Sequence, residues 1–221
     1  MTEHEMKELV VRQRTYFETG ATLPVTLRIT ALRKLYSAIS ANENAIHDAL
    51  KKDLGKSGFE SYMCETGLVL EEISYMLKHI RQFAREKRVH TPLSQFHSRS
   101  FQKPSPYGVV LIMSPWNYPF LLTLSPLADA LAAGNTAIVK PSAYSPYTSA
   151  ILQKILSQCF DPQYVAVVTG GRAENACLLR EHFYYIFFHR KPKCRKRSDA
   201  KGFRTPDACY LGTGREKPVY R

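Results

Sequence analysis

The sequence has few cysteines and does not arrange them as a disulfide or zinc scaffold would. It contains five of them in 221 residues: Cys64, Cys159, Cys177, Cys194 and Cys209. The number is odd and no two are closely spaced, which argues against a disulfide framework and against a zinc knuckle. We therefore expect no metal site. Free thiols are typical of a reducing compartment, so we expect a cytoplasmic protein.

Long apolar runs are also missing. No segment approaches the roughly 20 apolar residues that a helix needs to cross a bilayer. The first residues mix acidic and basic side chains at helical spacing, whereas a secretion signal has a basic head followed by an apolar block. We expect neither a transmembrane segment nor a signal peptide.

Acidic residues are scarce in one part of the chain. The formal net charge is +12, and residues 189–221 carry eleven Lys or Arg against three Asp or Glu. Two thirds of the excess positive charge therefore belongs to this basic tail. Clustered Lys and Arg attract nucleic acid through counterion release, but this excess lies in the tail and gives nonspecific attraction at most, so we expect no specific nucleic-acid binding.

The first half of the chain has the pattern of packed helices. Apolar residues recur at intervals of three, four or seven, which predicts helices over residues 3–18, 25–52 and 59–87. Residues 93–107 are polar with alternating aromatics and predict an exposed hairpin or arm. Residues 1–107 are thus expected to form a helical amino-terminal segment with an arm.

From Gly108 onward, short apolar runs alternate with helical stretches. VVLIMS, TAIVKPS, YVAVVTGG and YYIFF predict four buried strands, and the segments between them predict helices. This alternation is typical of a parallel sheet with right-handed crossovers. The fold class is therefore α/β, with an incomplete Rossmann-like parallel sheet over residues 108–188, a partial dinucleotide-binding domain.

One long motif gives more specific evidence of a family than the amino-acid composition does. Residues 108–142 read GVVLIMSPWNYPFLLTLSPLADALAAGNTAIVKPS, and this segment resembles the start of the cofactor domain of aldehyde dehydrogenases. GFESY at 58–62, followed by Glu65 and Glu71, and VVTGG at 167–171 are similar to the class 3-like, fatty-aldehyde branch. The resemblance extends over residues 1–188.

The resemblance implies a catalytic role for Asn117. The matching asparagine of the family donates its amide N–H to the oxyanion of the thiohemiacetal, and Asn117 follows a predicted strand, where an amide can point at a developing negative oxygen. The alternative is an asparagine that merely holds a turn. The substrate that the resemblance implies is a small-molecule aldehyde.

The resemblance also implies NAD or NADP as the cofactor. The matching lysine of the family bonds the adenosine ribose, which assigns this role to Lys140; Ser142, Gly170 and Trp116 belong to the same motifs and are expected to line the cofactor cleft. The alternatives are a solvated charge for Lys140 and a core position for Trp116. The family holds its cofactor without a G-x-G-x-x-G turn, and the sequence has none.

One residue departs from the pattern within the cofactor domain. The family usually follows Lys-Pro-Ser with a glutamate that holds the ribose hydroxyls, and here the residue is Ala143. Losing a charge-assisted hydrogen bond lowers affinity by about 1.5–3 kcal/mol, roughly ten- to a hundredfold. The substitution predicts weakened cofactor binding by this chain.

The basic tail does not continue the resemblance in its own reading frame. Read from the second base of the His189 codon, the codons that residues 189–221 allow permit 32 consecutive triplets of a typical aldehyde dehydrogenase continuation, including Leu-Glu-Leu-Gly-Gly. A one-base insertion near codon 188 or 189, genuine or a sequencing error, predicts such a tail. We expect the tail to be disordered.

This interpretation predicts an inactive product. The glutamate of Leu-Glu-Leu-Gly-Gly is the family's general base, and the nucleophilic cysteine lies beyond it, so the chain lacks both in frame. Cys64, Cys159 and Cys177 are expected to be packing residues. Missing neighbour strands would leave an open sheet edge, which predicts aggregation and makes oligomerisation doubtful.

Two other functions stay open at this point. The tail could bind nucleic acid nonspecifically through its charge. Alternatively, the chain could be a non-catalytic interaction protein that joins intact subunits of the same family.

Overall fold

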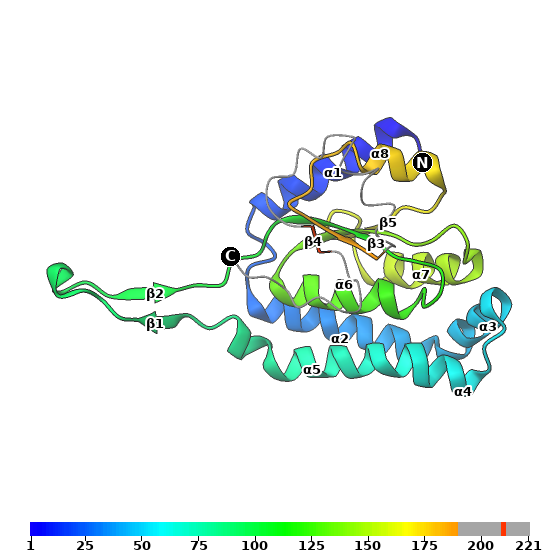
Figure 1. The fold of residues 1–221 in the computed structure, drawn as a ribbon, viewed down its shortest axis with the longest axis horizontal. Helices are drawn as coiled ribbons and strands as arrows, with labels where there is room; N and C mark the ends of the chain where they lie inside the picture. Colours follow the sequence, from blue (N-terminus) through cyan, green and yellow to red (C-terminus); the bar gives the residue numbers. More distant parts are fainter. Residues whose placement is uncertain (190–208, 211–221) are drawn as a thin grey trace.

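The computed structural model describes residues 1–189 and the backbone of residues 209–210. A parallel sheet lies at the centre, with helices on both of its faces and a two-stranded arm that projects from one side (Figure 1). The predicted α/β class, with a helical amino-terminal part and a parallel sheet, is confirmed.

The first helix, α1, spans Glu3–Glu18, as the periodicity predicts. Thr2 and Glu5 form a reciprocal capping box: Glu5 N donates to Thr2 Oγ1 at 3.3 Å, and Thr2 N donates to Glu5 Oε2 at 2.7 Å. Two of the N–H groups that a helix start leaves unpaired are thereby satisfied.

The helix predicted over residues 25–52 is two helices, α2 (Val25–Ala41) and α3 (Glu43–Leu54). Asn42 separates them with φ −110° and ψ 15°, and its Nδ2 donates to Ala38 O at 2.8 Å. A short amide side chain that bonds the preceding turn competes with helix continuation, which explains the break.

The helix predicted over residues 59–87 is also interrupted. It consists of α4 (Gly58–Ser61), a π-helical turn η1 (Tyr62–Thr66) and α5 (Gly67–Phe83). The helix ends at Phe83, before the predicted end at residue 87. Residue 87 instead begins β1 (Lys87–Val89), which pairs antiparallel with β2 (Ser100–Gln102). The predicted arm is therefore a hairpin, and it begins at residue 87 instead of residue 93. A short 3-10 turn, η2 (Leu93–Gln95), lies near its tip.

The sheet has the order β5-β4-β3-β6-β7, and every pair in it is parallel. Its strands are β3 (Val109–Met113), β4 (Thr136–Lys140), β5 (Val165–Val167), β6 (Tyr185–Phe188) and β7 (Cys209–Tyr210). The connecting helices are α6 (Leu121–Ala133), α7 (Pro146–Cys159) and α8 (Arg172–Leu178). The four strands predicted before residue 189 are all present, because each is a buried apolar run.

The fifth strand corrects one expectation. The basic tail is expected to be disordered, yet Cys209–Tyr210 pair with Ile186–Phe187 of β6. Pairing at a sheet edge uses backbone groups, so it requires little from the side chains. Residues 190–208 and 211–221, on which the expectation of disorder falls, lie outside the described residues.

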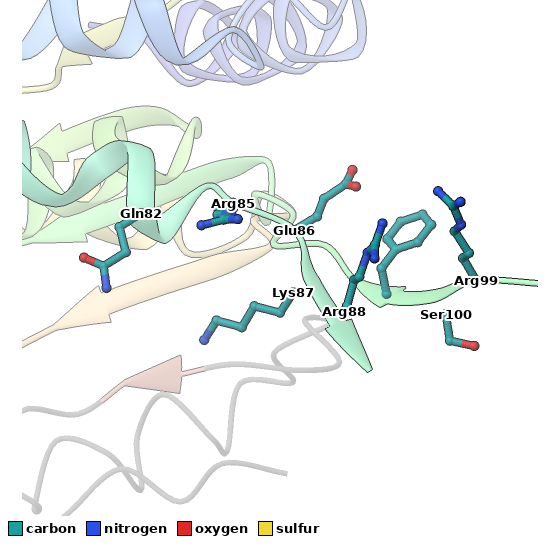
Figure 2. Close-up of a pocket in the computed structure, with 8 residues that line it drawn as sticks. Gln82, Arg85, Glu86, Lys87, Arg88, Arg99 and Ser100 are labelled. Atoms are coloured by element: carbon teal, nitrogen blue, oxygen red, sulfur yellow. The ribbon is translucent and has the colours of Figure 1, made fainter. Parts of the chain in front are cut away.

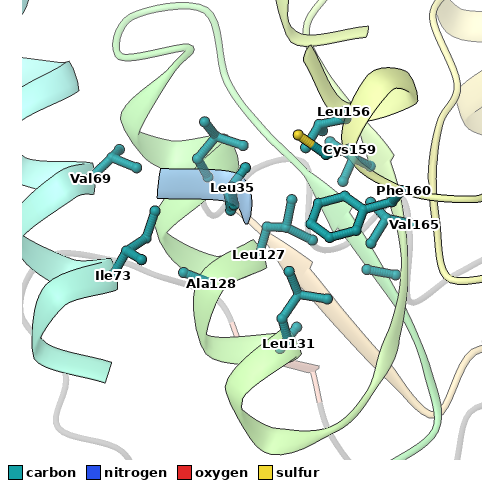
Figure 3. Close-up of a cluster of buried hydrophobic side chains, with 14 of the residues drawn as sticks. Leu35, Val69, Ile73, Leu127, Ala128, Leu131, Leu156, Cys159, Phe160 and Val165 are labelled. Atoms are coloured by element: carbon teal, nitrogen blue, oxygen red, sulfur yellow. The ribbon is translucent and has the colours of Figure 1, made fainter. Parts of the chain in front are cut away.

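Two apolar cores flank the sheet. The larger lies between the sheet and α2, α5, α6 and α7, and Figure 3 shows Leu35, Val69, Leu127 and Phe160 converging within it. The smaller lies on the opposite face, under α1 and α8, and includes Phe183. The amino-terminal helices thus cover both faces of the sheet, and their burial fixes the loops at the strand ends.

The interface between α5 and α6 contains a pair of acidic side chains and makes stability depend on pH. Desolvation between the two helices, together with the charge and hydrogen bond of Glu72, raises the pKa of Asp129 to about 7, although part of the Asp129 side chain remains exposed. In the unfolded chain this carboxyl loses its proton near pH 4. The folded chain is therefore favoured by this group at low pH, and that stability is lost as the pH rises from about 4 to about 7.

We expect Asp129→Asn to remove this loss. Between pH 5 and pH 8 its melting temperature should fall by roughly 2 °C less than that of the unsubstituted chain, a modest effect because Asp129 keeps contact with solvent. Thermal unfolding followed by circular dichroism measures the difference. Asp48→Asn, which removes the same charge at an exposed position of α3, is the control; equal pH dependence in both variants would contradict the prediction.

Candidate functional site

The loops at the carboxyl ends of the strands share one edge of the sheet. Residues 114–120 follow β3, residues 141–145 follow β4 and residues 168–171 follow β5. The chain moves from β3 to β4 and β5 on one side and then returns to β6 on the other side of β3. Such a reversal opens a crevice at the carboxyl ends, where open α/β sheets bind ligands.

Asn117 and Trp116 lie in the loop after β3. The loop is tied to the neighbouring strand, because Ser114 N donates to Lys140 O at 3.2 Å. Trp116 is 55% exposed, which rules out the alternative that it packs in the core. Asn117 is also exposed, so its amide is accessible at the strand end.

A residue with no assigned role in the sequence analysis holds the other end of this loop. Glu65, on the π-helical turn, accepts hydrogen bonds from Phe120 N at 2.8 Å and from Leu121 N at 3.2 Å. Glu65 is fully buried. Its partners are distant in the sequence, and no local pattern signals the contact.

Lys140 is buried, not solvated. It is 3% exposed at the end of β4, and its Nζ donates to Pro141 O at 2.9 Å and to Gly170 O at 2.7 Å. Burial lowers the pKa of Lys140, and the nearby charge of Glu174 opposes this shift. An ammonium has three N–H donors, so one remains for a ligand oxygen after the two carbonyls are bonded.

Gly170 and Ser142 shape the surroundings of Lys140. Gly170 has a φ of +133°, and a Cβ built there would collide with the side chain of Glu174. Glu174 Oε2 accepts from Gly171 N at 2.6 Å, and hydrogen bonds from the backbone lower the pKa of this carboxyl. Ser142 O accepts from Ser149 Oγ at 2.8 Å, which ties the loop after β4 to α7.

The structure thus brings some of the predicted residues together. Lys140 contacts Gly170 directly, and Ser142 follows Lys140 by two residues. Asn117 and Trp116 lie at the end of the adjacent strand, since Met113 of β3 is in register with Lys140 of β4. Ala143 is exposed in the loop after β4.

These features fit a nucleotide cofactor in part. The free donor of Lys140 suits a hydroxylated ligand, whereas the space beside Gly170 is filled by the side chain of Glu174. Ala143 supplies no polar group to such a ligand. The residues that would hold the cofactor are therefore Lys140 and the backbone around Ser142 and Gly170.

The three cysteines within residues 1–189 form no disulfide with one another. Cys159 belongs to the larger core, and burial raises the pKa of its thiol. Cys177 packs against the smaller core. The packing role is confirmed for these two, whereas Cys64 lies partly exposed on the π-helical turn.

A separate hollow lies at the base of the arm and holds none of the predicted site residues. Its volume is about 670 Å³, and Figure 2 shows its lining side chains at the junction of α5 with the hairpin. Arg85, Lys87, Arg88 and Arg99 make it basic. This cluster is distinct from the basic tail. The alternative that the tail binds nucleic acid concerns residues that lie mostly outside the described ones.

Within residues 1–189 no group of three or more His, Cys, Asp or Glu side chains is placed to hold a metal ion. None of the helices in this part of the chain has both the length and the apolar character needed to span a membrane.

Comparison with known proteins gives a consistent family. The family model described as "Aldehyde dehydrogenase family" matches residues 1–188. The 4,4'-diaponeurosporen-aldehyde dehydrogenase of Staphylococcus aureus is 40% identical over 175 residues, which cover 79% of this chain and 38% of that protein. Aldehyde dehydrogenase family 3 member B1 of Homo sapiens is 40% identical over 185 residues, covering 84% of this chain and 40% of that protein. The chain spans about two fifths of the length of these relatives.

Solved structures have the same fold. The substrate-bound state of Staphylococcus aureus AldH superposes with a TM-score of 0.89 at 35% identity, covering 92% of this chain and 44% of that one. The glyceraldehyde-3-phosphate dehydrogenase GapN of Methanocaldococcus jannaschii, complexed with NADP, has a TM-score of 0.81 at 21% identity, covering 96% and 46%. The second likeness concerns the fold alone.

The backbone at Gly170 gives a prediction that compares two adjacent glycines. We expect Gly170→Ala to lower the free energy of unfolding by about 1–3 kcal/mol, because a side chain at φ +133° is strained. Its Cβ would also displace Glu174 from Gly171 N. Urea denaturation measures the change.

Gly171→Ala is the matched control. Its φ is −109° and a Cβ there would meet no atom within 4 Å. We expect a smaller loss than at Gly170, because only Gly170 combines a positive φ with a collision of the added Cβ. If both variants lost the same stability, the strain assigned to Gly170 would be wrong.

Proposed function

The chain belongs to the aldehyde dehydrogenase family, and from that premise we propose that residues 1–188 supply the oxyanion donor and part of the cofactor floor of an NAD(P)-dependent enzyme that oxidises aldehydes to carboxylic acids. The observation that carries this proposal is the juxtaposition of two strand ends. An exposed Asn117 follows β3, and a buried Lys140 with one free donor ends the adjacent β4.

Asn117 acts on the carbonyl oxygen of the aldehyde. When a nucleophile attacks the carbonyl carbon, negative charge develops on the oxygen, and a fixed amide N–H stabilises that charge. The loop is pinned at both ends, by Ser114 N on Lys140 O and by Glu65 on Phe120 N. A donor held in this way needs little reorganisation during the reaction.

Lys140 holds the sugar part of the cofactor. Its bonds to Pro141 O and Gly170 O fix the ammonium in place, so that its third N–H would be available to a ribose hydroxyl. NAD or NADP, when bound, would supply the hydride acceptor for the reaction. Ala143 lacks the carboxylate that would accept from the same ribose, so the affinity is lowered.

A polypeptide of these 221 residues does not, in our proposal, oxidise aldehydes. The reaction needs a thiolate beside Asn117. Cys159 ends α7, and because α7 returns from the carboxyl edge of the sheet to its amino edge, this thiol lies at the opposite edge from Asn117. Its burial and raised pKa make it a poor nucleophile as well.

We further propose that the reading frame changes after Phe188. The family match ends at residue 188, which is where the alternative frame begins to permit Thr-Gly-Ser. In that frame the general-base glutamate follows, and we place the cysteine beyond it. Resequencing the gene across codon 188 tests this directly. A dehydrogenase continuation after Phe188, either in another frame or in the same frame once a misread base is removed, would support the proposal. DNA that encodes no such continuation in any frame would contradict it.

Activity tests the function itself. The purified 221-residue product should show no NAD(P)-dependent turnover of medium-chain aldehydes, whereas deletion of one base at codon 188 or 189 should yield an extended, active product. Within that product Asn117→Ala should lower kcat by about 10²–10³-fold, as loss of one oxyanion donor does. Turnover by the 221-residue product, or an Asn117→Ala variant with unchanged kcat, would refute the proposal.

Cofactor affinity provides an independent prediction. We expect Ala143→Glu to lower the Kd for NAD or NADP by about ten- to a hundredfold, because a carboxylate would again accept from the ribose hydroxyls. Isothermal titration calorimetry measures the change. Ala150→Glu introduces the same charge at an exposed position of α7; if it tightened binding equally, or if Ala143→Glu had no effect, the ribose contact would be disproved.

A further inference from the structure

A buried ion pair joins the π-helical turn to the loop that contains Asn117. Lys56 Nζ lies 2.5 Å from Glu65 Oε1, and both side chains are almost entirely removed from solvent. The other carboxylate oxygen of Glu65 accepts from Phe120 N and Leu121 N. Lys56 Nζ in turn lies 4.3 Å from the centre of the Tyr118 ring. The pair therefore contacts residues on the carboxyl side of Asn117.

The contacts satisfy a helix start that has no cap of its own. Phe120 is the N-cap residue of α6 and makes no side-chain capping bond. The first N–H groups of a helix lack intrahelical partners and carry partial positive charge, so a carboxylate is favoured there. Glu65 supplies that carboxylate from a different part of the chain, which fixes the position where the loop enters α6.

The π-helical turn is what directs Glu65 toward α6. Tyr62–Thr66 form a wider turn than an α-helix, and such turns are frequent at functional sites. A Cβ at Gly67 would lie 2.8 Å from Tyr62 O. The glycine therefore permits the local geometry on which the contact of Glu65 depends.

We propose that Glu65 and Lys56 are positioning residues that fix the conformation of residues 116–118 and so the direction of the Asn117 amide. The catalytic meaning of this positioning rests on the function proposed above. The positioning itself does not rest on that function, because it concerns only how well residues 116–118 are ordered in this chain.

Trp116 provides a direct reporter of the loop. It is the single tryptophan of the chain and is adjacent to Asn117. Thr123 Oγ1 holds both ends of the loop independently of the ion pair, because it donates to Pro119 O at the carboxyl end and lies 2.6 Å from Ser114 Oγ at the amino end. Removing the ion pair should therefore free residues 116–118 without releasing the whole segment.

The experiment is time-resolved fluorescence anisotropy of Trp116 in the 221-residue chain. Glu65→Gln keeps a neutral acceptor but loses the charge, and Lys56→Met removes the cation from the Tyr118 ring. We expect each to raise the amplitude of the nanosecond depolarisation about twofold, because a released loop moves on that timescale. Lys56→Arg keeps the cation and should restore the anisotropy of the unsubstituted chain.

Asp53 provides a control of the same chemistry elsewhere. Its carboxylate accepts from Tyr147 N at 3.2 Å and from Thr148 N at 2.6 Å, so that it caps α7 as Glu65 caps α6. Asp53→Asn should lower the melting temperature and leave the Trp116 anisotropy unchanged. This variant separates a loss of stability from a loss of loop order.

The outcomes decide between positioning and simple stabilisation. Increased depolarisation in Lys56→Met, reversed in Lys56→Arg and absent in Asp53→Asn, supports the proposal. If Glu65→Gln and Lys56→Met lower the melting temperature but leave the anisotropy unchanged, the pair only stabilises the fold and the proposal is wrong. Should Glu65→Gln fail to fold, the two Lys56 variants still decide. None of these readouts needs an aldehyde or a cofactor, so failure of the proposed function would not change them.

Discussion

Parallel strands can be joined only by a crossover, and the pairing of β3 with β4 through α6 is the constraint on which the site depends. Because both strands run in the same direction, the residues after Met113 and after Lys140 reach the same edge of the sheet. The return of the chain to β6 on the other side of β3 then opens a crevice at that edge. An exposed amide and a buried ammonium become neighbours through topology, although 23 positions separate Asn117 from Lys140 in the sequence.

Buried charges at this edge are satisfied mainly by backbone groups. Lys140 donates to two carbonyls, and Glu65 accepts from two N–H groups at the start of α6 as well as from Lys56. A buried charge without such partners would be strongly unfavourable. The arrangement therefore ties each charge to one backbone conformation, which is the kind of order that a catalytic loop requires.

The chain matches only part of the length of its relatives, so it contains only some of the residues that we propose for the reaction. The residues matched to the aldehyde dehydrogenase model contain the strand-end loops, and the chain spans about two fifths of its curated relatives. In the function that we propose, the nucleophile and the general base belong to the part of such an enzyme that residues 1–188 do not include. In that proposal, oxyanion stabilisation and ribose binding are encoded separately from the covalent chemistry.

The sequence by itself determined the elements whose signals are local. The apolar runs of β3 and β4, the capping box of α1, and Gly134 with its left-handed φ at the end of α6 follow from neighbouring residues. The ordered motif around Asn117 and Lys140 likewise identified the family. Only the tertiary structure decided that Lys140 is buried, that Glu65 reaches α6 from a π-helical turn, and that residues 209–210 pair with β6. These features depend on contacts between segments distant in the sequence, and the free energy of such contacts overrides local helical preference and the expected solvation of a charge.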